Sequence, residues 1–248
     1  MEVRKIRDLS LISIDEERIM VIACDSCGGI GVKEGDTLKV PTIYVARFTV
    51  RVAIMEVICS GAEIITITNA VCNEMKDTGI EVIKGIKEEL RLAGIDDIAL
   101  TGSTEENFKT ISTGIGITAI GMVSKDKLKV NSVKEEAIIV SIGIPKVGDE
   151  IDLVKDAEIV DYVTLYKLQQ SEYVYEIVPV GSKGIAYEAE MLAKNNGFKV
   201  KFNTGLLVDI HKSGGPSTCV IAAVNSKKIG EIIKNFNNVN IIAYLVKN

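Results

Sequence analysis

Histidine is almost absent from this 248-residue chain, and its five cysteines are an odd number. A disulfide framework and a structural zinc site are both disfavoured, because they need paired cysteines or nearby histidines. Cys24 and Cys27 form a single C-x-x-C, but glycines follow it where a thioredoxin-like site would begin a helix. We interpret this pair as small residues beside a turn. The one imidazole, His211, lies in a turn-forming segment and is interpreted as a loop residue rather than a base.

A surplus of basic residues is also missing. The chain has 29 Lys and Arg against 34 Asp and Glu, a net charge of −5, so it lacks a broad positive field for nucleic acid. The first twenty residues lack the apolar core of a signal peptide. The most apolar long stretch, 41–62, is interrupted by Arg47, Arg51 and Glu56, which disfavours a membrane span. We expect a cytoplasmic protein with no nucleic-acid or membrane partner.

What is present is the composition of a soluble globular protein, 47% hydrophobic and 25% charged. Short β-branched runs alternate with segments of helical period, which predicts an α/β or α+β fold with two subdomains. The polar segment 124–136 is the predicted boundary between domains at 1–125 and 136–248. The predicted strands are 18–24, 63–71, 98–101, 113–123, 137–143, 176–180, 199–202, 218–224 and 240–246; the predicted helices are 41–60, 79–93, 149–170, 182–196 and 226–236.

Asp25 is the first candidate functional residue, because it follows an apolar strand and opens a glycine-rich loop. A carboxylate at a strand end can hold Mg²⁺, and glycines let backbone amides approach phosphates. Lys33 and Lys39 of the same loop could add positive charge. The loop fits neither standard phosphate-binding fingerprint, so an ordinary flexible turn is the alternative.

Glu56 is the second candidate, since an acid in so apolar a helix needs a partner. That partner is either Arg47 or Arg51, in a structural ion pair, or a metal ion shared with Asp25. The third candidate is the polar stretch 101–108, TGSTEENF, which follows a short strand. It is either a ligand-binding loop or a solvated turn before a helix.

These three segments, taken with VIACD, RVAIMEVICSGAEIITIT and ALTGST, resemble the aminoimidazole ribonucleotide synthetase (PurM-like) superfamily, to which thiamine-monophosphate kinase also belongs. Asp25 matches the aspartate of the family's T-D motif, Glu56 lies in the N-D segment, and Gly102, Ser103 and Thr104 match G-G-[DE]-T. Glu56 replaces an aspartate, and Ser103 replaces an acid for which Glu105 or Glu106 could substitute. The resemblance covers about the first 125 residues well and the remainder loosely.

The resemblance implies a two-domain fold whose first domain dimerises through its sheet into a shared barrel, with a second α/β domain over the site. It implies Mg²⁺–ATP as cofactor, with Asp25 and Glu56 as catalytic metal ligands. The implied ATP-binding residues are Gly28, Gly29, Gly31, Lys33, Lys39, Gly102, Ser103 and Thr104. The substrate is expected between the domains, near Asn69, Asn73, Glu74, Glu105, Glu106 and Asn107.

The motifs look most like the short α-ribazole kinase branch, which implies transfer of the γ-phosphoryl group of ATP to a nucleoside hydroxyl. Two other interpretations remain open. One is an ATP-dependent enzyme of the same superfamily acting on a thiamine- or purine-pathway substrate. The other is a non-catalytic nucleotide-binding scaffold, in which Glu56 and Ser103 mark a decayed site.

Overall fold

The computed structural model describes residues 2–247, and the chain divides into two compact units. Unit 1 is built from the chain up to Val57 and from Ala62 to Lys125. Unit 2 is built from residues 58–61 and from Asp126 onward. Within residues 2–247, no helix combines the length and apolar character needed to cross a lipid bilayer.

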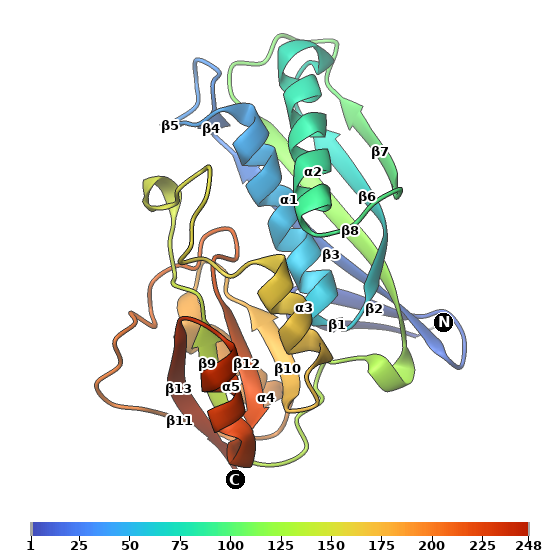
Figure 1. The fold of residues 1–248 in the computed structure, drawn as a ribbon. Helices are drawn as coiled ribbons and strands as arrows, with labels where there is room; N and C mark the ends of the chain where they lie inside the picture. The colour runs from blue at the N-terminus through green and yellow to red at the C-terminus, as the bar shows by residue number, and fades with distance from the viewer. Residues whose placement is uncertain (1, 248) are drawn as a thin grey trace. The chain divides into compact units, whose positions relative to one another are not determined.

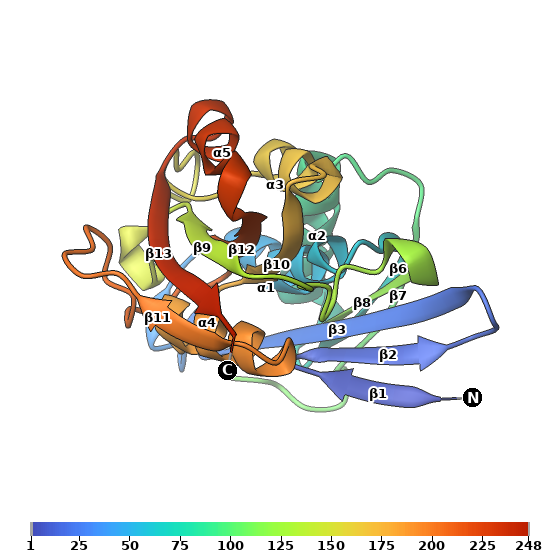
Figure 2. The ribbon, with the colours of Figure 1, turned by 90° about the horizontal axis from the view of Figure 1, so that it is seen from below.

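The frame of unit 1 is a six-stranded sheet in the order β1-β2-β3-β8-β6-β7 (Figure 1). Neighbouring strands are antiparallel, except that β6 and β7 are parallel and are joined through helix α2. Figure 2 shows the β1–β2 hairpin beside β3; its turn is Arg7-Asp8. The strands are β1 (Val3–Ile6), β2 (Leu9–Ser13), β3 (Arg18–Gly28), β6 (Glu63–Val71), β7 (Ala99–Thr104) and β8 (Gly114–Ser124), with a separate parallel pair, β4 (Ile30–Gly31) and β5 (Leu38–Lys39).

The helices α1 (Thr42–Cys59) and α2 (Ile80–Leu92) lie on one face of this sheet (Figure 1). Burial alternates accordingly along β8, where Ile115, Ile117 and Ala119 are buried and the residues between them are half-buried. We call the side under the helices the helix face. The opposite side, the open face, carries the cross-strand pairs Met20–Met122 and Ile22–Ile120 of β3 and β8.

Two glycines allow the close packing on the helix face. A Cβ on Gly85 of α2 would lie 2.3 Å from the carbonyl oxygen of Ile43 and 2.8 Å from the Cβ of Ala46, both on α1. A Cβ on Gly121 of β8 would lie 2.5 Å from Val57. The backbones of α1, α2 and β8 are therefore closer than any side chain would permit, and α1 contacts both its neighbours directly.

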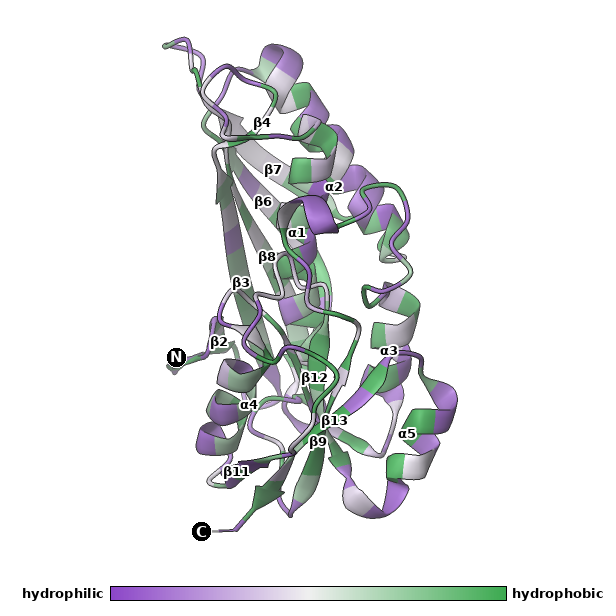
Figure 3. Cartoon of the chain, turned by 90° about the vertical axis from the view of Figure 1, so that its left-hand side faces the viewer, coloured by the Kyte–Doolittle hydropathy of each residue, from purple (hydrophilic) through white to green (hydrophobic). Residues whose placement is uncertain are grey.

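Unit 2 is a five-stranded antiparallel sheet in the order β10-β12-β9-β13-β11. Figure 3 shows α4 on one side of its apolar strands and α3 with α5 on the other. Every residue of the central strand β9 is buried, as expected for a strand covered on both faces. The elements are β9 (Ala137–Ile142), β10 (Val174–Pro179), β11 (Lys199–Phe202), β12 (Val220–Asn225), β13 (Val239–Val246), α3 (Tyr162–Gln170), α4 (Gly184–Asn195) and α5 (Ile229–Asn235), with short turns of 3₁₀ helix at 125–127, 148–150 and 226–228.

The mixed α/β class predicted from the sequence is correct, but three elements differ. The hairpin of β1 and β2 was not predicted, and β3 continues past Cys24 to Gly28, so Asp25 lies inside a strand. The helix predicted over 149–170 is wrong in its first half, because only Tyr162–Gln170 is helical. Asp161 caps that helix by accepting a hydrogen bond from the Thr164 amide at 2.7 Å.

The residues before α3 are irregular because a polar centre organises them. Lys146 forms ion pairs with Asp156 at 2.8 Å and with Glu158 at 2.6 Å. The Asp156 carboxylate also accepts the backbone amides of Asp152 and Glu158. Side chains that satisfy backbone groups in this way compete with helix formation. The periodicity of the sequence does not reveal such contacts.

The contact between α1 and α2 gives the first testable prediction. Gly85→Ala should lower the free energy of unfolding by about 1–3 kcal/mol, because the new methyl group has no space, although alanine favours a helix by about 1 kcal/mol. The measurement is the urea unfolding midpoint. Gly230→Ala in α5 is the matched control, since a Cβ there meets no atom within 4 Å. Equal midpoints for Gly85→Ala and the wild type would contradict the packing described.

Candidate functional site

Three of the residues predicted for the site stand in one cross-strand row of unit 1. Asp25 of β3 is paired with Ile117 of β8, Ile117 with Asn69 of β6, and Asn69 with Gly102 of β7. Neighbouring strands lie about 4.8 Å apart, so the Cα atoms of Asp25 and Asn69 are about 10 Å apart. Ile117 is buried on the helix face, so this row belongs to that face.

Asp25 is half-buried on the helix face of β3. Burial raises the pKa of its carboxyl group to about 6; a backbone hydrogen bond from Ser26 opposes the shift, and the negative charge of Asp8 adds to it. Asp8 is in the β1–β2 turn, which brings two carboxylates into one neighbourhood. The arrangement favours a proton or a cation on Asp25.

Glu56 lies on α1 and is 8% exposed. Its Oε2 is 3.9 Å from Nη1 of Arg7, whose side chain is itself buried. Arg7 precedes Asp8 in the same hairpin turn and has a positive φ of 53°, a conformation that non-glycine residues seldom adopt. The same two-residue turn therefore carries Arg7, which contacts Glu56, and Asp8, whose charge acts on Asp25.

The sequence indicated Arg47 or Arg51 as the ionic partner of Glu56; the structure adds Arg7, which the sequence did not indicate. Arg47 and Arg51 form ion pairs with Glu89 of α2, at 3.1 Å and 3.7 Å. Glu89 is 2% exposed, so these charges hold α1 against α2. The signal that was missed is the hairpin itself, because only the pairing of β1 with β2 brings Arg7 to α1.

Within residues 2–247, no three His, Cys, Asp or Glu side chains gather as a ready-made metal cage. Mg²⁺ does not require such a cage, since it is usually held by one or two carboxylates together with water and substrate phosphates. Asp25 fits such a role, since a cation would offset the burial of its carboxylate. Glu56 would have to exchange its contact with Arg7 for the ion.

The glycine-rich loop begins where β3 ends. A Cβ added to Gly28 or to Gly29 would meet no atom within 4 Å, and Gly29 has a φ of 74°. These two glycines therefore border open space in which a ligand could approach the backbone. Gly31 is different, because a Cβ there would lie 2.3 Å from Oγ1 of Thr113. Its small size serves the packing of the loop.

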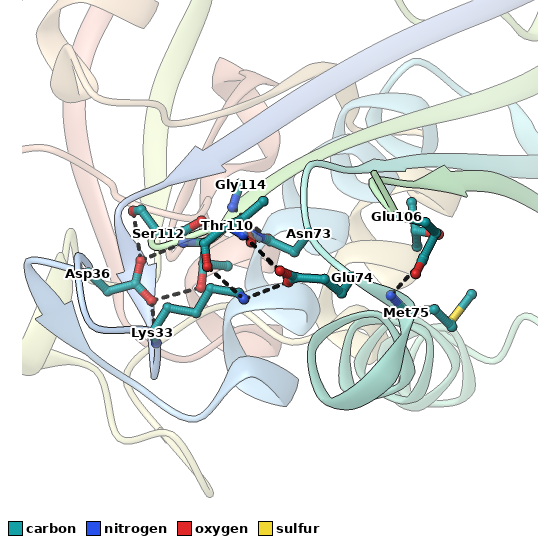
Figure 4. Close-up of polar contacts among 11 residues, drawn as sticks. Lys33, Asp36, Asn73, Glu74, Met75, Glu106, Thr110, Ser112 and Gly114 are labelled. Atoms are coloured by element: carbon teal, nitrogen blue, oxygen red, sulfur yellow. Dashed lines mark hydrogen bonds and ion pairs between the residues drawn. The ribbon is translucent and has the colours of Figure 1, made fainter. Parts of the chain in front are cut away.

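The loop is anchored by Asp36, a buried carboxylate (Figure 4). It accepts hydrogen bonds from the Thr113 amide at 2.6 Å, the Thr113 hydroxyl at 2.7 Å, the Ser112 hydroxyl at 2.9 Å and the Lys33 amide at 2.9 Å. Burial acts to raise the pKa of Asp36, but these hydrogen bonds outweigh it and hold the pKa below its usual value. The anchor fixes the loop to the start of β8.

Lys33 and Glu74 form a second anchor beside the first (Figure 4). Lys33 Nζ lies 2.7 Å from Glu74 Oε2 and 3.2 Å from the Thr110 carbonyl oxygen. The Lys33 ammonium group and the Thr110 amide hold the pKa of Glu74 at about 2. Lys39 donates to the backbone carbonyls of Lys33 and Glu34. Both predicted phosphate-binding lysines thus already have partners within unit 1.

Asn73, predicted as a substrate contact, has no exposed surface. Its amide group donates to the Thr110 hydroxyl at 2.7 Å and to the Ser112 carbonyl at 2.8 Å, and accepts from the Gly114 amide at 3.0 Å. This side chain supports the loop before β8. The hydroxyl-rich run of Thr110, Ser112 and Thr113 was the available signal for this network, and the sequence analysis gave it no role.

The stretch 101–108 is the edge strand β7 followed by a loop, and no helix follows it. Glu106 accepts from the Thr104 hydroxyl at 2.7 Å and the Met75 amide at 2.8 Å, and both hydrogen bonds lower its pKa (Figure 4). Glu105 accepts the Asn107 amide at 2.6 Å. Ser103 pairs with Ala70 on the open face, opposite to the row of Asp25.

Cys24 and Cys27 lie three positions apart in β3, so their side chains point to opposite faces of the sheet. They cannot chelate one ion together. Burial raises the pKa of the Cys27 thiol, and the charge of Asp25 raises it further. The interpretation of the pair as residues beside a turn is corrected, since both are strand residues.

No family model and no curated protein matches this sequence, but solved structures do. PurL from Thermotoga maritima, complexed with FGAR, matches with a TM-score of 0.69 at 12% identity over 96% of this chain and 43% of PurL. Another structure of that PurL is a complex with ATP. Thiamine-monophosphate kinase from Stenotrophomonas maltophilia K279a matches with a TM-score of 0.66 at 13% identity, over 99% of this chain and 89% of the kinase. A chain of a HypE–HypF complex gives 0.68 at 14%, over 96% and 87%.

The chain has a PurM-like fold. The fold expected from the resemblance is therefore confirmed. Sequence identities of 12–14% support a shared fold and do not establish a shared function. The chain spans less than half the length of PurL. The α-ribazole kinase branch and the dimeric barrel stay predictions.

The raised pKa of Asp25 gives a prediction about stability. The folded pKa of about 6 lies above the ordinary value of 3.8, so stability falls as the pH rises from about 4 to about 6. A shift of about two units corresponds to about 2.7 kcal/mol, which partial exposure reduces to about 1–2 kcal/mol. Asp25→Asn should therefore unfold at higher urea than the wild type at pH 7.5, with the difference vanishing near pH 4. Asp96→Asn, at an exposed position, should match the wild type throughout.

Proposed function

We propose that the protein is an ATP-dependent phosphotransferase that uses Mg²⁺ and phosphorylates a hydroxyl group of a small nucleoside-like substrate. The observation that carries the proposal is the row of Asp25, Asn69 and Gly102 in a PurM-like fold. The row brings a carboxylate and an amide to one side of the sheet, with the Asn69 side chain lying against Gly102. The likeness to a thiamine-monophosphate kinase and to a PurL that binds ATP supports the same chemistry.

Each part of the row has a task in such a transfer. Phosphoryl transfer needs mainly positioning and charge neutralisation, so no covalent nucleophile is required. Asp25, with Glu56 nearby, would hold the Mg²⁺, which neutralises charge on the phosphates. Gly28 and Gly29 leave room for the triphosphate at the end of β3. The Asn69 amide, which donates to the Thr101 carbonyl at 3.2 Å, covers Gly102 and shapes the β7 side.

For the acceptor we propose α-ribazole, through its ribose 5′-hydroxyl. Asn69 of the row and the predicted substrate contacts Glu105, Glu106 and Asn107 are neutral or acidic, with Lys109 as a nearby cation. This composition suits a nucleoside without a phosphate. The nearby Lys33 is paired with Glu74. A phosphorylated acceptor would need unpaired arginines or lysines at this place.

A thiamine-monophosphate kinase-like activity is the second candidate. The observation in its favour is that the match to that kinase covers 99% of this chain and 89% of the kinase. Such an acceptor carries a phosphate, so Lys33 or Lys39 would have to leave its present partner to bind it. The two candidates differ in this requirement and are separated by the choice of acceptor.

The test is ATP turnover with Mg²⁺ and one acceptor at a time, with the product identified by mass. We expect phosphorylated α-ribazole, and at least a 100-fold loss of rate in Asp25→Asn, as when a charge-stabilising group is removed from a transition state. Asp96→Asn is the control at an exposed acid. Phosphorylation of thiamine monophosphate alone would overturn the acceptor, and no turnover with any acceptor would overturn the kinase.

We also propose a homodimer formed through the open face of unit 1. Its central pairs, Met20–Met122 and Ile22–Ile120, are apolar. Both helices of unit 1 lie on the other face (Figure 1). An apolar sheet face is stable in water when another layer covers it, and a second copy of the same sheet would do so while closing its edges. The apolar pairs support the barrel that the resemblance implies.

The dimer is tested by light scattering of the full chain at micromolar concentration. The wild type should have twice the chain mass of 26.9 kDa, and Ile120→Lys should shift it to the monomer, because the ammonium group would be buried without a partner. Val154→Lys, at a side chain 79% exposed in unit 2, is the matched control and should leave the mass unchanged. A monomeric wild type would count against the interface.

A further inference from the structure

A cavity of about 330 Å³ lies in unit 2, apart from every residue given a role above. It forms where β9 ends and β13 begins, since Ile144 follows β9 and Val239 opens β13, where it pairs with Ile142. The loop that carries Leu207 and Val208 supplies the facing wall. The volume is at the lower end of the range for small-molecule sites.

Part of the lining of this cavity is apolar. Ile144, Val208 and Val239 form this part together with Leu207, which is 98% exposed. A fully exposed leucine leaves apolar area in water, and a flat ligand that covers this area is stabilised by its removal from water. The apolar wall therefore favours a ligand with a ring or a hydrocarbon face.

Another part of the lining is polar. Asn238 and Asn240 belong to it, and in the part of the chain that the structure describes their side-chain amides form no hydrogen bond with the protein. Asn238 has a positive φ of 52°, the turn conformation that leads into β13. Each carboxamide offers a donor pair and an acceptor side by side. Two such groups in the lining of one cavity favour a ligand whose edge alternates donors and acceptors.

The charged residues at the cavity do not suit an anion or a metal ion. Lys212 is paired with Glu150 at 2.7 Å, and Asp209 accepts the His211 amide at 2.9 Å. One carboxylate is too few ligands for a cation site, and the lysine charge is already balanced. The chemistry of the lining points to a neutral molecule.

We propose that this cavity binds a neutral planar heterocycle of the nucleobase type, with its ring on the Leu207 wall and its amidine- or lactam-type edge on Asn240 and Asn238. An asparagine carboxamide pairs in this way with the edge of adenine, which presents an adjacent acceptor and amino group. The site consists of unit 2 residues alone and does not depend on the proposed phosphotransfer.

The test is an amide NMR titration of the ¹⁵N-labelled full chain with adenine and with cytosine. We expect saturable shifts at Ile144, Val208 and Val239, with a Kd of about 1 mM or tighter for a ligand of this size. Toluene, which has the ring without the edge, and inorganic phosphate should bind at least fivefold more weakly. An outcome in which they bind equally well would overturn the proposal.

Substitutions of the lining residues test which side chains contact the ligand. Asn240→Ala should weaken binding by at least fivefold, the lower end of what a paired carboxamide contributes. Leu207→Ser should also weaken it and cannot disturb the core, because Leu207 is exposed. Asn237→Ala, an exposed neighbour that does not line the cavity, is the matched control. Unchanged affinity in both Asn240→Ala and Leu207→Ser, or shifts confined to unit 1, would overturn the site; the latter would leave the proposed ATP site intact.

Discussion

The Asp36 carboxylate is the constraint on which the candidate site depends. It is buried and accepts four hydrogen bonds, two from Thr113 and one each from Ser112 and Lys33. Buried charge is costly unless hydrogen bonds satisfy it, so the loop and the start of β8 must stay together. The position of the loop then fixes Gly28 and Gly29 at the end of β3. The lysine and glutamate of the second anchor reinforce the same geometry.

The long-range contacts of this anchor illustrate which residues of the site can be predicted from the sequence and which cannot. Local signals were sufficient for α1, for β6 and for the strand leading to Asp25, since periodicity and β-branched runs act over short distances. The partners of the charges were not found, because they come from remote segments: Arg7 meets Glu56 only through the hairpin, and Asp36 meets Thr113 across 77 residues. A residue type shows that a partner is needed, whereas the tertiary fold decides which one it is.

Some of the residues predicted to contact a ligand are instead held in contacts within the protein. Asn73 and Glu74 have the chemistry of substrate contacts, yet they are engaged in holding the loop before β8. Asp25 is the opposite case: burial raises the pKa of its carboxyl group, and the charge of another acid, Asp8, adds to the shift. Carboxyl groups whose surroundings raise their pKa are common in functional sites. The electrostatics therefore give Asp25 greater weight than the family motif alone.

Asp25 and Glu56 differ in the charged residue that acts on each of them. Arg7 of the hairpin turn lies beside Glu56, and the charge of Asp8 in the same turn acts on Asp25. If the two acids hold the proposed divalent ion, that ion would offset the burial of the Asp25 carboxylate and compete with Arg7 for Glu56. The proposed ion would then act on the hairpin turn, in which Arg7 has a φ of 53°. The β1–β2 hairpin, which no motif marks, is in this view part of the site.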